Sequence, residues 1–120
     1  MPTYRHGLGD DTERYIGHDH GYIEYRFAPG GTCEIVNIEV ENGHRREGVG
    51  RLLVTELLSA CREDKKASLI YAITRADNLI AQEFYEGCNF RVVGALRRFY
   101  SSSEKKVDAI MYGRSVEGPI

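Results

Sequence analysis

The sequence contains no apolar run that approaches membrane-spanning length, and no apolar stretch follows Met1–His6. A transmembrane helix needs about 20 consecutive apolar residues, so we expect neither a membrane anchor nor a signal peptide. Internal repeats, linkers and low-complexity tracts are also absent from the sequence. Because 120 residues leave room for one hydrophobic core, we expect a single domain, 1–120.

An excess of charge of one sign is also missing. The formal net charge is −2, with 16 Lys and Arg against 18 Asp and Glu. No basic face is evident that could displace many counterions, so we expect no nucleic-acid partner. The hydrophobic content of 42% and the charged content of 28% are typical of a globular protein.

Candidate metal ligands are few. Cys33, Cys61 and Cys88 are odd in number and lack metal-ligand spacing, so we expect reduced thiols in a cytoplasmic protein. His18 and His20 are two residues apart, which puts them on one face of an extended chain. No third ligand stands out beside them, so we interpret this segment as polar surface and expect no metal.

Hydrophobic periodicity predicts a mixed α/β (α+β) fold. Tyr22–Phe27 and Cys33–Val40 are expected to form an antiparallel hairpin. No element is predicted in Met1–His20, which is polar and has weak periodicity. The other predicted elements are a helix from about Gly48 to Lys65, a strand at Ser68–Thr74, a helix at Leu79–Gly87 capped by Asp77 or Asn78, and strands at Phe90–Tyr100 and Val107–Ser115. The strand at Ser68–Thr74 is expected to be parallel because a crossover helix precedes it, in a mainly antiparallel sheet flanked by two helices.

A basic glycine loop lies between the second strand and the first helix. It runs Arg45, Arg46, Glu47, Gly48, Val49, Gly50 and Arg51. The first N–H groups of a helix have no intrahelical partner, and the helix dipole favours negative charge there. Gly48 and Gly50 allow a phosphate to approach the main chain, and the arginines can neutralise it. The loop lacks both P-loop spacing and the three glycines of the dinucleotide fingerprint, so it predicts another kind of phosphorylated ligand.

Two patterns carry a resemblance to a known family. Arg45-x-x-Gly48-x-Gly50 resembles the acetyl-CoA pyrophosphate loop of the GNAT superfamily of N-acetyltransferases. Asn78-x-x-Ala81-x-x-Phe84-Tyr85, followed by Cys88-Asn89-Phe90, resembles a second signature of the same superfamily and occurs in the expected order. The segments Leu96–Tyr100 and Val107–Met111 look most like the branch that acetylates protein N-termini, including ribosomal-protein N-acetyltransferases.

The resemblance implies a GNAT-like fold with acetyl-CoA as cosubstrate, an amine acceptor and no metal. It implies that Arg45–Arg51 holds the pyrophosphate. It also implies that the backbone amides of Ile38 and Val40 bind the pantetheine arm and the thioester carbonyl, and that Asn78 bonds the pantetheine region. Phe84 belongs to the second signature, and the resemblance implies that it also binds the cofactor.

Tyr85 occupies the general-acid position of that family. A free thiol titrates near ~8.5 and a phenol near ~10, so protonating the leaving sulfur is only mildly uphill. Tyr85 shares a helix face with Ala81 and Phe84, so a purely structural core tyrosine is the alternative.

The sequence leaves the general base open. The N-terminal acetyltransferases often place a glutamate where this chain has Ile73. Other branches use a glutamate at the start of the strand before the phosphate loop, and Glu34 matches that register. Glu39 lies closer to the loop and, at an odd separation from Glu34, is expected on the opposite face of the strand. A water chain to solvent is the third possibility.

Two departures from the family pattern affect the prediction. Asn89 stands where the family usually has glycine, at a position expected to need positive φ, which asparagine tolerates best after glycine. Only Met1–Gly21 precede Tyr22, where the family has a strand and two helices that wall the acceptor side. With this shortened N-terminal region, we expect an open acceptor pocket or one completed by a second subunit, and so a homodimer.

The resulting hypothesis is an N-acetyltransferase that moves an acetyl group from acetyl-CoA to a primary amine by direct attack in a ternary complex. The acceptor is a protein N-terminus or a small-molecule amine. The alternative is an acyl-CoA-binding module, regulatory or partner-dependent, that has lost efficient chemistry.

Overall fold

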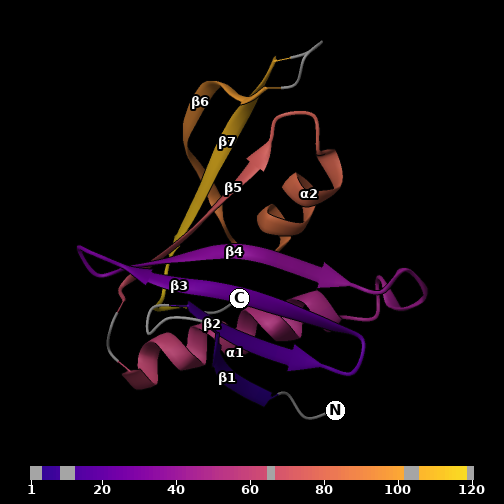
Figure 1. The fold of residues 1–120 in the computed structure, drawn as a ribbon, viewed down its shortest axis with the longest axis vertical. Coiled ribbons are helices and arrows are strands. Elements are labelled where there is room, and N and C mark those ends of the chain that lie inside the picture. The colour runs from indigo at the N-terminus through magenta and orange to yellow at the C-terminus, as the bar shows by residue number, and fades with distance from the viewer. Residues whose placement is uncertain (1–3, 9–12, 65–66, 102–105, 119–120) are drawn as a thin grey trace. The chain divides into compact units, whose positions relative to one another are not determined.

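The structure, a computed structural model, describes residues 4–8, 13–64, 67–101 and 106–118 (Figure 1). The chain divides into two compact units. The first comprises Met1–Ile70 and Ser115–Ile120, and the second comprises Tyr71–Arg114. No helix in the described ranges is long and apolar enough to cross a membrane.

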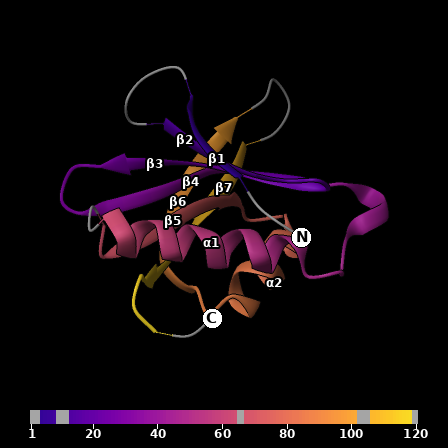
Figure 2. The same cartoon turned by 90° about the horizontal axis from the view of Figure 1, so that it is seen from below.

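In its described residues, the first unit contains a four-stranded antiparallel meander and one long helix. Its elements are β1 (Tyr4–Leu8), β2 (Glu13–His18), β3 (Gly21–Ala28), β4 (Thr32–Val40), the 3-10 turn η1 (Asn42–His44) and α1 (Val49–Asp64). Each strand pairs antiparallel with the next along the chain. Helix α1 lies along one face of these strands (Figure 2).

The core of the first unit forms between that face and α1. Buried residues of α1 recur at helical spacing, as an amphipathic helix requires: Val49, Leu53, Val54, Leu57, Leu58, Ala60 and Cys61. Ile16 and Ile23 are fully buried on the strand side. Burial of each large aliphatic side chain contributes roughly 1.5–3 kcal/mol, so this packing stabilises α1 against the strands.

A β-bulge in β4 changes which side chains share a face. Tyr25 pairs with Ile35 and Glu24 pairs with Asn37, so Val36 is the extra residue. Beyond the bulge the alternation of β4 shifts by one residue. The prediction that Glu34 and Glu39 lie on opposite faces is therefore wrong. They pair with Arg26 and Tyr22, which are four residues apart on the regular strand β3, and so they share its outer face.

The second unit holds most of β5 (Leu69–Arg75), α2 (Leu79–Gly87), β6 (Arg91–Ser101) and most of β7 (Lys106–Ser115). β6 and β7 pair antiparallel, with irregularities at Val92/Gly94 and Leu96/Tyr100. Within the second irregularity Arg98 has φ 53°, and its N–H donates to Asp108 Oδ1 over 2.8 Å. The core of this unit includes Tyr85, Phe90 and Tyr112, which are all buried.

The predicted fold class and both helices are confirmed, and every predicted strand is present. The prediction for the N-terminal segment is wrong: the described residues of Met1–His20 form the strands β1 and β2, where no element was expected. The predicted end of the first helix at Lys65 falls outside the described residues. The parallel sense of the strand at Ser68–Thr74 stays a prediction.

Candidate functional site

The backbone of the basic loop is shaped by two left-handed residues. Arg46 has φ 65° and Gly48 has φ 84°. A Cβ atom at Gly48 would meet nothing within 4 Å, so this glycine is required for its backbone conformation and not for space. The turn delivers the chain into α1, whose first intrahelical bond runs from Leu52 N–H to Gly48 O over 2.9 Å. The amides of Val49 and Gly50 lie ahead of that bond, at the positive end of the helix dipole.

The charges around the loop favour an anion. Arg45 donates from Nε to the carbonyl oxygen of Val40 over 3.3 Å, which holds its side chain against the end of β4. Arg46 and Arg51 are exposed, and the first turn of α1 carries no acidic residue. Glu47 is the one acid of the loop, and its carboxylate is paired with Nδ1 of His44 at 3.0 Å. The arrangement can therefore hold a phosphate or pyrophosphate group.

The end of β4 is packed tightly beside this loop. Gly21 pairs with Val40, and a Cβ atom at Gly21 would come within 2.5 Å of the carbonyl oxygen of Glu39. Ile38 pairs with the buried Ile23, so the side chain of Ile38 faces the core. The two residues expected to offer backbone amides, Ile38 and Val40, thus lie in the last three positions of β4, immediately before the loop.

The two candidate bases differ in their surroundings. Glu34 is half-buried and accepts a hydrogen bond from the guanidinium of Arg26 in an ion pair. Glu39 is exposed on the same outer face. Burial raises the pKa of the Tyr22 phenol, and the charges of Glu39 and then Glu24 raise it further, against the lowering effect of a hydrogen bond from Asn37. Glu39 and Tyr22 therefore share one electrostatic environment at the end of β4.

Sequence reasoning did not identify Tyr22 and Asn37 as part of this outer face. Asn37 Nδ2 donates to the Tyr22 hydroxyl over 3.1 Å, and the Tyr22 ring stacks on Tyr15 with centroids 5.4 Å apart. Alternating polar and aromatic residues in Tyr22–Phe27 were the available signal. The bulge at Val36 hid which residues of β4 oppose them.

In the second unit, Asn78 caps α2. Its Oδ1 accepts from the N–H of Ala81 over 3.1 Å, and Asn78 N–H donates to Arg75 O. Asp77, the other predicted cap, instead takes both carboxylate oxygens to Arg75 at 2.9 and 3.0 Å. Asn78 is therefore the helix cap, and its exposed side chain lies at the N-terminus of α2.

Tyr85 lies inside an aromatic cluster of the second unit. Its ring contacts Phe90 and Tyr112 with centroids 5.3 and 5.7 Å apart, and Phe84 at 5.4 Å, and only 6% of its surface is exposed. Burial raises the pKa of its phenol to about 12, with smaller contributions from Cys88 and Tyr100. Tyr85 is therefore protonated at any physiological pH and can donate a proton or a hydrogen bond.

The expected positive φ at Asn89 is confirmed. Asn89 has φ 64°, its N–H donates to Glu86 O over 3.1 Å, and the Phe90 N–H donates to Tyr85 O over 3.0 Å. These two bonds form a Schellman motif, completed by the contact between the Phe90 and Tyr85 rings. The motif that ends α2 thus also fixes the position of the Tyr85 backbone.

The predicted site residues fall into two groups. The loop Arg45–Arg51, the end of β4 and both candidate glutamates lie in the first unit, whereas Asn78, Phe84 and Tyr85 lie in the second. Each group is locally ordered: the first offers a phosphate cradle beside the end of a strand, and the second offers a buried proton donor on a capped helix.

Comparison with known proteins identifies the architecture. The model of the acetyltransferase (GNAT) family matches residues 4–90. An N-alpha-acetyltransferase of Saccharolobus solfataricus is 31% identical over 80 residues, which are 67% of this chain and 46% of that protein. The ribosomal protein bS18-alanine N-acetyltransferase of Escherichia coli is 29% identical over 77 residues, which are 64% of this chain and 51% of that protein. The chain therefore spans about half the length of the curated relatives it matches.

The fold is similar to that of solved acetyltransferases. A structure from Bacillus anthracis, described as a streptothricin acetyltransferase in complex with acetyl coenzyme A, superposes on this chain with a TM-score of 0.81. The two chains are 22% identical, and the match covers 91% of this chain and 65% of the other. This similarity concerns the fold.

Proposed function

Because the chain belongs to the GNAT family of acetyltransferases, we propose that it transfers an acetyl group from acetyl-CoA to a primary amine. The observation that carries the proposal is the loop Arg45–Arg51, in which a left-handed Gly48 leads directly into the N-terminus of α1. This loop would hold the pyrophosphate of acetyl-CoA through the amides of Val49 and Gly50 and the guanidinium groups of Arg45, Arg46 and Arg51. Glu47 would act on the loop indirectly, through its contact with His44.

The rest of the cofactor would extend from the loop along the end of β4. The backbone amides of Ile38 and Val40 are proposed to bind the pantetheine arm and the thioester carbonyl, and Asn78 the pantetheine region. Amide donors aimed at the thioester oxygen would stabilise the negative charge that develops there during attack. Phe84 would pack against the cofactor from α2.

The proposed reaction is a direct transfer. The neutral amine attacks the thioester carbon, a C–N bond forms, the C–S bond breaks, the amine loses a proton and the CoA thiolate takes one up. Tyr85 is proposed to donate to the leaving sulfur. Its pKa of about 12 exceeds the ~8.5 of a free thiol, so full proton transfer costs about 5 kcal/mol. Proton transfer from an ordinary phenol would cost less. We therefore expect Tyr85 to act mainly through a hydrogen bond that stabilises the thiolate.

We propose Glu39, in preference to Glu34, as the acceptor of the amine proton. Glu34 is engaged with Arg26, whereas Glu39 is exposed at the end of β4 beside Tyr22. Glu39→Gln should then lower kcat/KM at neutral pH about 100-fold and leave acetyl-CoA affinity unchanged. If neither Glu39→Gln nor Glu34→Gln changes the pH profile, the proton leaves through water.

The acceptor is proposed to be the α-amine of a protein or peptide, because one relative is named an N-alpha-acetyltransferase and another a ribosomal protein bS18-alanine N-acetyltransferase. The experiment is a CoA-release assay with acetyl-CoA, peptides bearing free N-terminal amines, and a panel of small amines, alongside calorimetry of acetyl-CoA binding. Turnover with peptides supports this acceptor, and turnover with small amines alone shifts it to that class. Tight acetyl-CoA binding without any turnover would leave a binding module.

We further propose one functional domain that works in the cytoplasm as a homodimer, without nucleic acid or membrane. The family model runs across the boundary between Ile70 and Tyr71, which supports a single domain. Cys33, Cys61 and Cys88 are buried thiols, as a reducing compartment allows. Exposed apolar side chains on β6, at Val92 and Val93, are candidates for a subunit contact. Light scattering of the wild type and of Val93→Glu would test the dimer: a monomeric wild type contradicts it.

A further inference from the structure

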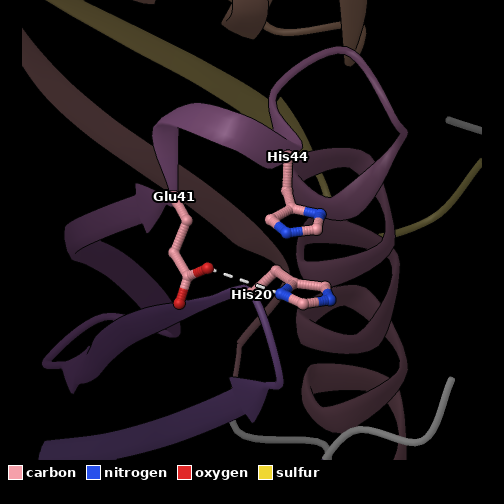
Figure 3. Close-up of side chains that lie close together, drawn as sticks. All are labelled: His20, Glu41 and His44. Atoms are coloured by element: carbon pink, nitrogen blue, oxygen red, sulfur yellow. Dashed lines mark hydrogen bonds and ion pairs between the residues drawn. The ribbon is translucent and has the colours of Figure 1, made fainter.

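Three side chains from two turns of the first unit converge beside the basic loop. His20 lies between β2 and β3, Glu41 follows β4, and His44 ends η1 (Figure 3). Their possible ligand atoms, a ring nitrogen from each histidine and a carboxylate oxygen from Glu41, all lie within 4.8 Å of one another. We propose that His20, Glu41 and His44 form a binding site for Zn²⁺, with water in the fourth position.

The residue types fit this ion. Imidazole nitrogen and carboxylate oxygen both bind Zn²⁺ at about 2.0–2.2 Å, and two histidines with one glutamate are a known tetrahedral set that keeps one position open. In such a tetrahedron two neighbouring ligand atoms lie about 3.3 Å apart. His20 Nδ1 and Glu41 Oε2 are 3.4 Å apart, which is long for an N–H···O hydrogen bond and close to that ligand spacing.

The backbone already holds the three residues together. Glu41 N–H donates to His20 O over 2.9 Å, and His44 N–H donates to Glu41 O over 2.9 Å. These bonds join the turn after β2 to the segment after β4, and the close packing of Gly21 against Glu39 and Val40 supports the junction. Because the backbone of these residues is already ordered, binding of an ion costs little backbone entropy.

Neighbouring groups orient the ring nitrogens. Glu47 occupies Nδ1 of His44 at 3.0 Å, which leaves Nε2 of that ring as the ligand. A carboxylate on the second nitrogen of a ligating histidine is a common arrangement, and it makes the histidine a better ligand. His18 Nδ1 accepts from the backbone N–H of His20 over 3.0 Å, which fixes the turn that carries His20.

One rearrangement must accompany binding. The His20 and His44 rings stack with centroids 3.5 Å apart and an interplanar angle of 7°. A ring nitrogen binds a metal in the plane of its ring, so two parallel stacked rings cannot both aim at one ion. One ring has to turn out of the stack. Rotation about the Cβ–Cγ bond of histidine is broad, so this turn costs little.

A cavity next to the two histidine ligands has room for the water that completes the coordination. It has a volume of about 310 Å³ and is lined by His18, His20, His44, Glu47, Gly48, Val49 and Leu52, whereas Glu41 lies outside this lining. A single water needs two or more polar partners, which this lining supplies.

The proposal replaces the expectation from sequence that no metal binds. His18 and His20 are close in sequence, but only His20 belongs to the ligand set. The other two ligands come from Glu41 and His44, more than twenty residues later. The hairpin of β3 and β4 brings them back to the turn before β3.

The test is calorimetric titration of the full chain, free of any polyhistidine tag, with ZnCl₂, together with visible spectra after addition of Co²⁺. We expect one ion per chain and the d–d absorption of tetrahedral Co²⁺. His20→Asn, Glu41→Gln and His44→Asn should each weaken Zn²⁺ binding more than tenfold, and Glu47→Gln about tenfold. Asp19→Asn is the matched control, because it removes a neighbouring exposed charge outside the ligand set and should leave Zn²⁺ affinity unchanged.

Several results would overturn the site. These are no heat of Zn²⁺ binding at millimolar ion, equal affinity in wild type and His44→Asn, or thiolate-to-Co²⁺ charge-transfer bands that point to the cysteines. Circular dichroism of each variant separates lost ligation from lost folding, and Glu41→Gln, at an exposed position, is the variant least able to disturb the fold. The titration contains no acetyl-CoA, so its outcome is independent of whether the chain transfers acetyl groups.

Discussion

Burial has two opposing effects on Tyr85 as a catalytic acid. Burial among aromatic rings raises the pKa of the phenol to about 12. The phenol is therefore protonated at physiological pH, but complete transfer of its proton is costly. The same surroundings exclude water, which strengthens a hydrogen bond to a thiolate. A phenol in this setting acts by stabilising charge as it develops.

Tyr85→Phe should therefore lower kcat about 100-fold while acetyl-CoA affinity changes less than threefold. The phenylalanine ring keeps the contacts with Phe90 and Tyr112, so the variant should remain folded. CoA release at saturating substrates measures kcat, and calorimetry measures the affinity. A kcat within threefold of wild type would reduce Tyr85 to a core residue.

Cys33 shows a second consequence of burial at a single residue. A hydrogen bond with Cys61 and then burial raise the pKa of the Cys33 thiol, and both side chains have no exposed surface. Because the thiolate is the reactive form, we expect labelling of Cys33 by a thiol-specific disulfide reagent to be at least tenfold slower in the native protein than in denaturant. Mass mapping identifies the labelled site, and rapid native labelling of Cys33 would contradict its protonated, enclosed state.

The Schellman motif that ends α2 can be tested through Asn89. An alanine at φ 64° lacks the local hydrogen bonding that lets asparagine adopt this conformation, so Asn89→Ala should lower the free energy of unfolding by about 1 kcal/mol. Asn89→Gly should leave it unchanged or raise it slightly. Urea denaturation measures both. Equal stability of the alanine and glycine variants would show that the backbone does not hold positive φ in solution.

The start of β3 packs against the end of β4 at Gly21, where glycine is needed for space and not for its backbone conformation. Gly21→Ala places a methyl group against the Glu39 carbonyl oxygen and Val40, so it should destabilise the chain by about 1–3 kcal/mol. Gly43→Ala is the matched control, because a Cβ there meets nothing within 4 Å and should cost under about 0.5 kcal/mol. If Gly21→Ala leaves the free energy of unfolding unchanged, the backbone at the end of β4 can move to accommodate the methyl group.

These elements show what the sequence could and could not predict. The positive φ at Asn89 followed from its place after a helix, and the start of α1 followed from glycine and apolar spacing. β1 and β2 were missed because glycine and polar residues interrupt their alternation, and Ile16 is the one aliphatic residue of Glu13–His18. The shared face of Glu34 and Glu39 was missed because one extra residue, Val36, resets the alternation without any composition signal.

At the scale of the whole chain, long-range neighbours were the hardest to predict. His20 and Glu41 are joined by a backbone hydrogen bond, yet they are far apart in the sequence and belong to no common motif. Periodicity reports which face of an element is buried. It does not report which turns meet at the end of a sheet, because that depends on strand lengths and bulges.

The stability of the whole chain should fall in alkaline solution, and the sign follows from the tyrosines. Tyr85 has a folded pKa of about 12 against about 10 in the unfolded chain, so between these values the unfolded state has lost a proton that the native state keeps. The contribution of Tyr85 to the free energy of unfolding is therefore fully present below pH 10 and declines as the pH rises to about 12. The loss from Tyr85 alone is about 2.7 kcal/mol. Burial and the hydrogen bond to Glu86 also raise the pKa of Tyr112, which adds in the same direction.

Urea denaturation from pH 8 to pH 12 measures this loss, with Tyr85→Phe as the comparison. The variant carries no phenol at position 85, so its stability should decline by about 2.7 kcal/mol less than that of the wild type over the same range. Lysine and arginine deprotonation affects both proteins alike and cancels in the difference. Parallel curves for the two proteins would show that the phenol of Tyr85 titrates as freely in the native state as in the unfolded chain, and would remove the basis for treating it as a buried, fully protonated donor.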